Sequence, residues 1–141
     1  MSRILVALQF ILIALVAFPF NAPSIDALNL SLFALGLLVF VFAFAAMKQR
    51  TFTVMPEPKQ HGELVTHGIY RMVRHPMYLA ALLCAIGASL AYHEIWKWGL
   101  SVLLLLVLMM KIRREEKLLL NRYAGYAAYR AKVKAIIPFV L

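Results

Sequence analysis

Acidic side chains are scarce in this sequence: aspartate and glutamate together number 6 among 141 residues. All charged types make up only 15% of the chain, whereas a soluble globular domain carries about 25%. Hydrophobic residues make up 64%. A composition so poor in charge excludes an ordinary soluble domain. It favours a single all-α integral membrane domain covering residues 1–141.

Cysteine is almost absent, since Cys84 is the only one in the chain. A single cysteine excludes both a disulfide within the chain and a metal cluster built from cysteines. The four histidines include no pair at i, i+4 with a third ligand nearby, which is the spacing that zinc favours on a helix. We therefore expect no metal site, and we expect Cys84 to be a packing residue.

Four stretches contain no charged residue, and they cover 4–20, 27–47, 76–92 and 98–110. A helix needs about 17–25 apolar residues to cross a bilayer. The fourth stretch is short, but Ile95 and Trp96 extend it backwards, and Lys97 can reach the interface with its charged end. The sequence therefore predicts four transmembrane helices, at about 4–18, 27–47, 76–92 and from 95 onwards.

The polar connections predict how these helices are joined. The first two form an N-terminal hairpin within 1–47, and the segment 48–141 forms the core that carries the binding site. Only His93 and Glu94 separate the third and fourth helices, which predicts an antiparallel hairpin. No glycine or proline occurs between Ser101 and Ala124, so the fourth helix should continue beyond the membrane to about 120. A second amphipathic helix is expected at about 122–134.

Positive charge is unevenly distributed along this chain of net charge +9. It gathers before the first helix, between the second and third, and after the fourth. The other two connections hold only Asp26, Glu94 and Lys97. The positive-inside rule then places both termini and the 48–75 connection in the cytoplasm. The basic face should attract anionic membrane lipids. Binding to nucleic acid is not expected, because no soluble domain remains to present the charge.

The stretch 67–78 gathers polar side chains directly before an apolar helix. His75 precedes Pro76, which suits the first turn of a helix, where free N–H groups and the helix dipole favour an anion. Arg71 and Arg74 add positive charge, and Tyr70 and Tyr78 supply ring faces and hydroxyls. Such a stretch is either a basic anchor at the membrane surface or a ligand site, and the residues alone leave both open.

Two adjacent carboxylates, Glu115 and Glu116, follow at the basic end of the fourth helix. A solvated charge cluster is the simpler interpretation, although these are two of only 6 acidic residues. Tyr123, Tyr126 and Tyr129 come next at a spacing of three. That spacing is compatible with an amphipathic helix on lipid or with an aromatic cover over a ligand.

Taken in order, these residues resemble a family pattern, that of the isoprenylcysteine carboxyl methyltransferases and the related phospholipid methyltransferases. The pattern Gly-x-Tyr-x-x-x-Arg-His-Pro-x-Tyr, followed by a hydrophobic hairpin and Glu-Glu, is matched here by Gly68, Tyr70, Arg74, His75, Pro76, Tyr78, Glu115 and Glu116. The resemblance covers about 63–138 and is to the short bacterial members of the family, which implies a bacterial inner membrane. Ala80 stands where members of the family often have glycine.

The resemblance implies S-adenosyl-L-methionine as the methyl donor and a lipophilic acceptor, such as an isoprenylcysteine-type carboxylate. The residues that it implies for binding the donor are Val65, His67, Gly68, Tyr70, His75, Pro76, Tyr78, Glu115, Glu116 and Tyr126. Those that it implies for catalysis are Glu116, Arg122 and Arg74. His75 with the helix N-terminus would take the donor carboxylate, and Glu115 or Glu116 its ammonium or ribose.

The acceptor remains open at this point. A carboxylate nucleophile needs no general base and would be oriented by Arg122 or Arg74, whereas an amine would need Glu116 to remove a proton. A lipophilic acceptor would enter laterally, into a cavity near the basic ends of the third and fourth helices. Three alternatives remain, namely a phospholipid N-methyltransferase, a nicotinamide-dependent membrane reductase and a non-catalytic scaffold of the same fold. A thin bundle of this kind also predicts pairing into a homodimer.

Overall fold

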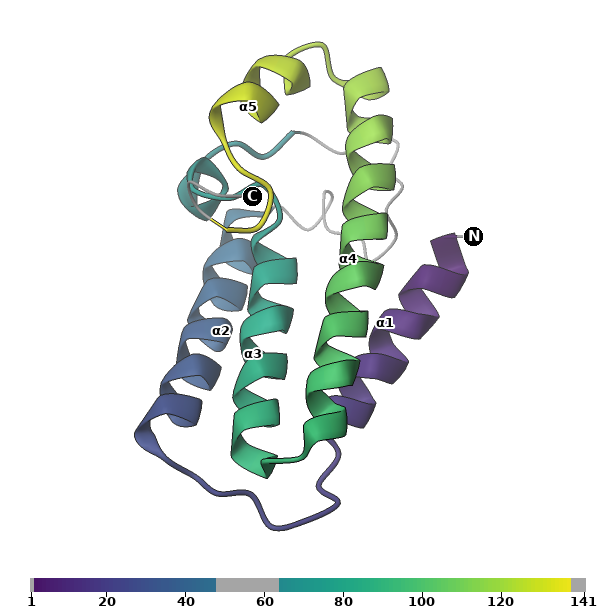
Figure 1. Ribbon diagram of the computed structural model, residues 1–141. Coiled ribbons are helices and arrows are strands. Elements are labelled where there is room, and N and C mark those ends of the chain that lie inside the picture. The colour runs from purple at the N-terminus through teal and green to yellow at the C-terminus, as the bar shows by residue number, and fades with distance from the viewer. Residues whose placement is uncertain (1, 48–63, 138–141) are drawn as a thin grey trace.

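The computed structural model describes residues 2–47 and 64–137, and the described chain is helical, as predicted (Figure 1). Its elements are α1 (Ser2–Ala17), α2 (Ala27–Ala46), the short 3-10 helix η1 (Gly68–Arg71), α3 (Pro76–Tyr92), α4 (Ile95–Arg122) and α5 (Tyr126–Lys132). The bounds of α2 and α3 follow the runs without charge closely, whereas α4 extends well beyond its run at both ends. The first part of the predicted 48–75 connection, residues 48–63, lies outside the described residues.

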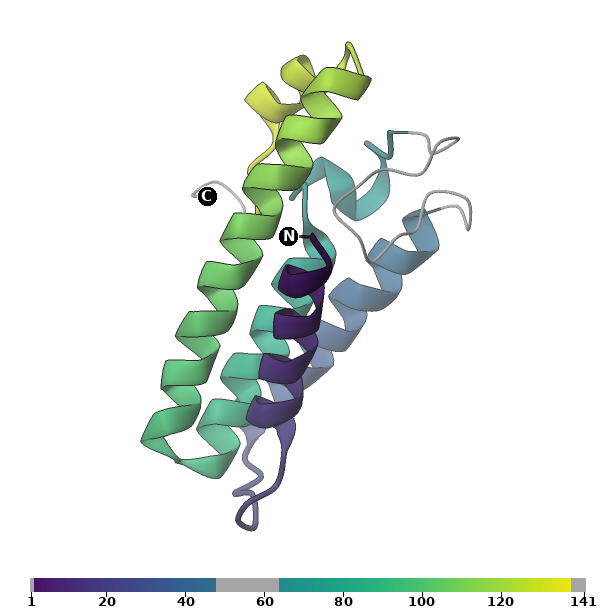
Figure 2. The same cartoon turned by 90° about the vertical axis from the view of Figure 1, so that its right-hand side faces the viewer.

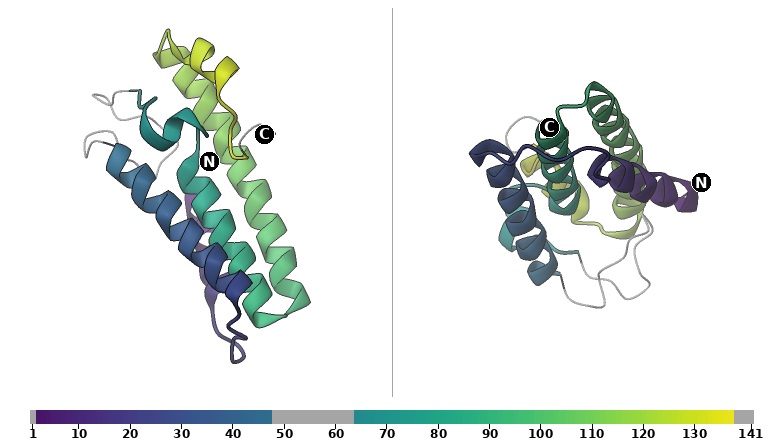
Figure 3. Two further views of the ribbon diagram at one scale, coloured as in Figure 1. Left: turned by 90° about the vertical axis from the view of Figure 1, so that its left-hand side faces the viewer. Right: turned by 90° about the horizontal axis from the view of Figure 1, so that it is seen from below.

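The four long helices run alternately in opposite directions, with α3 at the centre (Figures 1 and 2). Helix α2 packs along one side of α3, and α4 packs against another side. Helix α1 packs mainly against α4. The two helices of the predicted N-terminal hairpin, 1–47, therefore pack against different neighbours and lie apart. Seen from below, the 18–26 connection crosses under the bundle between α1 and α2 (Figure 3).

Small residues let α2 and α3 approach closely. A Cβ atom at Gly36 would lie 2.7 Å from the Cys84 Sγ, and one at Gly87 would lie 3.3 Å from the Asn29 carbonyl oxygen. Ala80, Ala85 and Ala88 are buried in α3. These small residues allow close packing, and the contact fixes α3 against α2 along its length.

Two of the described helices, α2 and α4, are long and apolar enough to cross a membrane. Helices α1 and α3, with 16 and 17 residues, are apolar but shorter. The four predicted spans and their orientation therefore stay a prediction. Large apolar side chains are nevertheless exposed along α2, including Leu38 at 54% and Phe42 at 61%, which suits contact with lipid.

The turn between α3 and α4 is as tight as predicted, and His93 adopts the left-handed conformation with φ of 52°. Lys97, however, does not reach outwards, so the expectation that it snorkels to the interface is wrong. Its side chain is fully buried, and its ammonium donates to the carbonyl oxygens of Val16 at 3.0 Å and Phe18 at 2.7 Å. Val16 lies in the last turn of α1, where carbonyl oxygens lack helical partners, and Phe18 lies just beyond it, with its oxygen also accepting from the Phe20 N–H at 3.1 Å. The negative end of the helix dipole favours a cation at this position.

At the opposite end, α4 continues past the other helices and α5 folds back over the N-terminus of α3 (Figure 1). The chain after α5 then runs beside residues 73–75 and forms an isolated parallel bridge between Val73 and Lys134. The backbone N–H of Arg74 donates to the Lys134 oxygen at 2.8 Å, and that of His75 to the Ala135 oxygen at 2.9 Å. This returning segment, 133–135, holds α5 against the start of α3.

Candidate functional site

Glu116 is the centre of a buried ionic cluster at the basic end of the bundle. The Glu116 Oε1 accepts from the Arg74 Nε at 2.8 Å and lies 2.6 Å from the Arg74 Nη2. The other oxygen, Oε2, lies 3.0 Å from the Arg130 Nε, and the His75 Nε2 lies 3.4 Å from Oε1. The Glu116 side chain is only 7% exposed. Three partners that favour its ionised form make Glu116 an organising charge and a poor proton acceptor.

Glu115, one residue earlier, faces a different neighbourhood. Its Oε2 accepts a hydrogen bond from the Tyr78 hydroxyl at 3.0 Å and lies 3.6 Å from the His75 Nδ1. The His75 and Tyr78 rings stack at 5.5 Å with an interplanar angle of 11°. His75 therefore lies between the two carboxylates. Its Nε2 is within hydrogen-bond distance of Glu116 on α4, whereas its Nδ1 lies near Glu115 without a hydrogen bond.

Contacts from η1 and from the segment between η1 and α3 also hold α5 in place. Arg74 uses its remaining guanidinium nitrogen to donate to the carbonyl oxygens of Arg130, at 3.0 Å, and Val133. The Tyr129 hydroxyl donates to the Tyr70 carbonyl oxygen at 2.5 Å. Because Arg74 binds both Glu116 and the chain around α5, it couples the ionic cluster to the position of that helix.

Tyr126 is the one tyrosine of this cluster whose hydroxyl is buried without a hydrogen-bond partner among the described residues. The residue is 1% exposed. Burial, with nearby Glu116, raises the pKa of its hydroxyl, so Tyr126 remains a hydrogen-bond donor at neutral pH. A buried hydroxyl without a partner is uncommon in folded proteins. It marks a place where a ligand atom can complete the structure.

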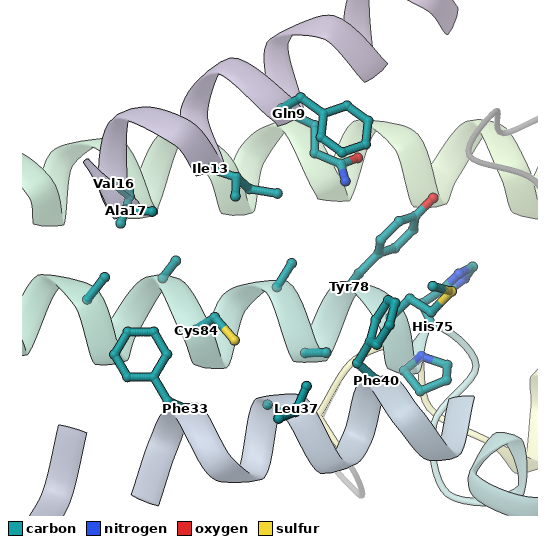
Figure 4. A pocket seen from close by; sticks show the side chains of 18 of the residues that line it. Gln9, Ile13, Val16, Ala17, Phe33, Leu37, Phe40, His75, Tyr78 and Cys84 are labelled. Carbon is teal, nitrogen blue, oxygen red and sulfur yellow. The ribbon is translucent and has the colours of Figure 1, made fainter. Parts of the chain in front are cut away.

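A cavity of about 920 Å³ reaches this end of the bundle. It runs between α1 and α2, with α3 as its floor, as Figure 4 shows. Apolar side chains line most of its length, including Ile13, Val16, Phe33, Leu37 and Ala88. Its polar lining gathers at one end, in Gln9, Tyr70, Arg74, His75, Tyr78, Lys111 and Glu115. The predicted cavity near the basic end of α3 is therefore present, but it extends much further along the helix.

The structure places most of the predicted site residues together. Tyr70, Arg74, His75, Pro76, Tyr78 and Glu115 line the cavity, while Glu116 and Tyr126 lie beside them in the ionic cluster. Gly68 has φ of 61°, a left-handed conformation that glycine adopts without strain. Val65 and His67 precede it in extended backbone, half-buried and exposed respectively.

Arg122 occupies a different position from the other predicted catalytic residues. It is exposed in the last turn of α4, and its guanidinium carbon lies 5.7 Å from the centre of the Tyr123 ring. Six residues of helix separate it from Glu116, a rise of about 9 Å. Arg130, which sequence reasoning left among the general basic residues, is the second arginine that binds Glu116, beside Arg74.

Sequence reasoning also missed Gln9 and Lys111, which join α1 to α4 at the polar end of the cavity. The Lys111 ammonium donates to the Gln9 side-chain oxygen, and both residues are buried, at 1% and 8% exposure. A signal for the pair did exist. Gln9 is the single amide side chain within the first apolar run, and Lys111 is the first charge after the fourth.

A family model for phospholipid methyltransferases matches residues 25–125, which cover α2, α3 and α4. The chain belongs to the phospholipid methyltransferase family. The match includes the start of α3, with Arg74 and His75, and both carboxylates of α4, so the predicted resemblance is confirmed.

Curated relatives of this family member are plant proteins. Protein-S-isoprenylcysteine O-methyltransferase A of Arabidopsis thaliana is 32% identical over 85 residues, which are 58% of this chain and 43% of the relative. The probable protein-S-isoprenylcysteine O-methyltransferases of Oryza sativa subsp. indica and subsp. japonica are each 32% identical over 83 residues, or 57% of this chain. The matched region thus spans less than half the length of these relatives.

Proposed function

We propose that this chain is an integral membrane enzyme that transfers a methyl group from S-adenosyl-L-methionine to a lipophilic acceptor. One observation carries the proposal: a long apolar cavity ends at the carboxylate, imidazole and hydroxyls of Glu115, His75, Tyr70 and Tyr78. A lipophilic acceptor has an apolar tail and a polar reacting group, and a cavity with an apolar part and a polar end can hold both. The family match and the names of the plant relatives support the same reaction class.

The residues beside Glu115 have the chemistry that the donor requires. S-adenosyl-L-methionine supplies an electrophilic methyl group on a sulfonium, together with an ammonium, a carboxylate and ribose hydroxyls. Glu115 lines the cavity whereas Glu116 is enclosed by cations, so we assign the ammonium or ribose contact to Glu115. The unpartnered Tyr126 hydroxyl fits a polar donor atom, and tyrosine rings suit the sulfonium.

The apolar part of the cavity fits the tail of the acceptor. From Met77 to Ala88 the floor spans twelve residues of α3, about 16 Å along the helix axis. The walls on either side belong to α1 and α2, which lie apart, so a tail can enter between them from the lipid (Figure 3). The proposed enzyme thus draws its acceptor from the membrane, with all four long helices embedded and the basic end in the cytoplasm.

Glu116 has a positioning role in this proposal. A carboxylate that binds two arginines and approaches a histidine keeps its negative charge, so it is a weak base for an amine nucleophile. A nucleophile that is already ionised, such as an isoprenylcysteine-type carboxylate, needs no such base. Catalysis then consists of aligning the nucleophile with the methyl group and excluding water.

The reaction is tested directly with purified protein in nanodiscs and S-adenosyl-L-methionine labelled in its methyl group. We expect label to enter a prenylcysteine carboxylate analogue, and S-adenosylhomocysteine to bind in calorimetry. Label in phosphatidylethanolamine instead would make the chain a phospholipid N-methyltransferase. Binding of a reduced nicotinamide in place of S-adenosylhomocysteine, or of neither, would overturn the proposal in favour of a reductase or a scaffold.

Replacing Tyr126 with phenylalanine separates a ligand role from a structural one. The hydroxyl has no partner among the described residues, so its removal should leave the melting temperature without ligand unchanged or raise it. The affinity for S-adenosylhomocysteine should fall by about tenfold, the loss of one hydrogen bond. Tyr129→Phe is the matched control, because that hydroxyl already binds the Tyr70 carbonyl and its loss should lower stability. Unchanged affinity in Tyr126→Phe would remove Tyr126 from the donor site.

A further inference from the structure

Lys111 places a positive charge inside the acceptor cavity, at its polar end. It lies on α4, is 1% exposed, and lines the same cavity as Tyr78 and Glu115. Its ammonium donates to the amide oxygen of Gln9, which comes from α1, and lies 5.1 Å from the centre of the Tyr78 ring. A buried ammonium is costly unless it is used or well paired. The amide oxygen of Gln9 is an uncharged partner, and the negative charge of Glu115, which lines the same cavity, also acts on the ammonium.

The charges around the polar end leave room for one more anion. Among the described residues of this cluster, Arg74, Arg130 and Lys111 are positive, while Glu115 and Glu116 are negative. Both arginines bind Glu116, at 2.6 Å and 3.0 Å. S-adenosyl-L-methionine would add a further net positive charge through its sulfonium. An acceptor with a negative head group therefore balances the site better than one with a cationic head group.

We propose that Lys111, held in place by Gln9, is the specificity-determining residue that binds an anionic head group of the acceptor. The proposal rests on the function proposed above. A carboxylate has two oxygens, so Lys111 can hold one while the other attacks the methyl carbon. A C–O bond then forms, the methyl–sulfur bond breaks with its electron pair left on sulfur, and no proton is released. Lys111 takes no part in bond making. It selects the head group and orients it.

The arrangement also explains why Gln9 is polar within an otherwise apolar helix. A neutral amide keeps the ammonium in position before the acceptor arrives, without the competition that a second carboxylate would create. Since α1 forms one wall of the cavity, the same contact joins that wall to the head-group position. An acceptor held by Lys111 thus places its tail between α1 and α2.

The test compares two probes that share one prenyl thioether tail and differ only in the head, a carboxylate or its primary amide. Calorimetry measures their affinities for the full chain loaded with S-adenosylhomocysteine. We expect the wild type to bind the carboxylate at least about tenfold more tightly, as one charge-assisted hydrogen bond provides. Lys111→Met should abolish this ratio, and Lys111→Arg should retain most of it. Arg113→Met, which removes an exposed charge from the same turn of α4, is the matched control and should keep the ratio.

A ratio of affinities does not depend on how much protein is folded, so it separates recognition from a structural role. If Lys111→Met weakens both probes equally, Lys111 only ties α4 to α1 and the inference is wrong. Equal binding of both probes to the wild type would also overturn it, while leaving the proposed methyl transfer intact. Failure of S-adenosylhomocysteine to bind the wild type would instead overturn the proposed function, and the inference with it.

Discussion

Glu116→Gln is expected to cost this protein both its stability and its donor site. The substitution keeps the shape of the side chain but leaves the buried Arg74 facing a neutral amide, and it also removes the partner of the half-exposed Arg130. Removing one partner of a buried ion pair typically destabilises by about 3–5 kcal/mol. Arg74 also holds the Arg130 and Val133 carbonyl oxygens, so the loss should loosen α5. Tyr126 would lose its position, and the affinity for S-adenosylhomocysteine should fall by more than tenfold.

Glu115→Gln is the matched control for this prediction, since it removes the adjacent charge. Its amide oxygen can still accept from the Tyr78 hydroxyl, so stability should change little while donor binding weakens. Thermal unfolding and calorimetry measure the two effects, and limited trypsin digestion at Lys132 reports whether α5 has loosened. A melting temperature lowered more by Glu115→Gln than by Glu116→Gln would contradict the central position that we give to Glu116.

The helices of this protein follow from local features of the sequence. Charge-free runs set the lengths of α2 and α3, Pro76 begins α3, and the absence of glycine and proline lets α4 continue to Arg122. Each feature acts within a few residues of its own position, which is why sequence patterns report it well. The grouping of Tyr70, His75 and Tyr78 at one end also follows, because all lie just before or within the first turn of one helix.

The partners of the polar side chains could not be predicted in the same way. Lys111 binds Gln9, which is 102 residues away in the chain, and Arg130 rather than Arg122 reaches Glu116. These choices depend on how α1 and α5 dock. Docking is set by the packing of whole helices and by the returning segment 133–135. The hydrophobic periodicity of a single segment does not determine it. Lys97 illustrates the same limit, since its local pattern indicated an interfacial lysine and its tertiary surroundings enclose it.

Lys97→Met is expected to be the most damaging substitution at the end of the bundle opposite the ionic cluster. The ammonium donates to the Val16 and Phe18 carbonyl oxygens and lies 3.4 Å from the centre of the Tyr92 ring. Methionine fills similar space and avoids the cost of burying a charge, but it leaves both carbonyls without this donor. Because each hydrogen bond to a charged group contributes about 1.5–3 kcal/mol, we expect a net loss of about 2–4 kcal/mol.

The pattern of effects distinguishes this role from general destabilisation. Lys97 holds the end of α1, and α1 is a wall of the acceptor cavity but supplies none of the residues assigned to the donor. The folded variant should therefore bind S-adenosylhomocysteine normally, while its affinity for a prenyl thioether probe falls severalfold. Lys132→Met, at an exposed lysine of α5, should change stability by no more than about 0.5 kcal/mol. If Lys97→Met melts at the wild-type temperature, apolar packing alone holds α1 against α4, and the cavity wall does not depend on this buried cation.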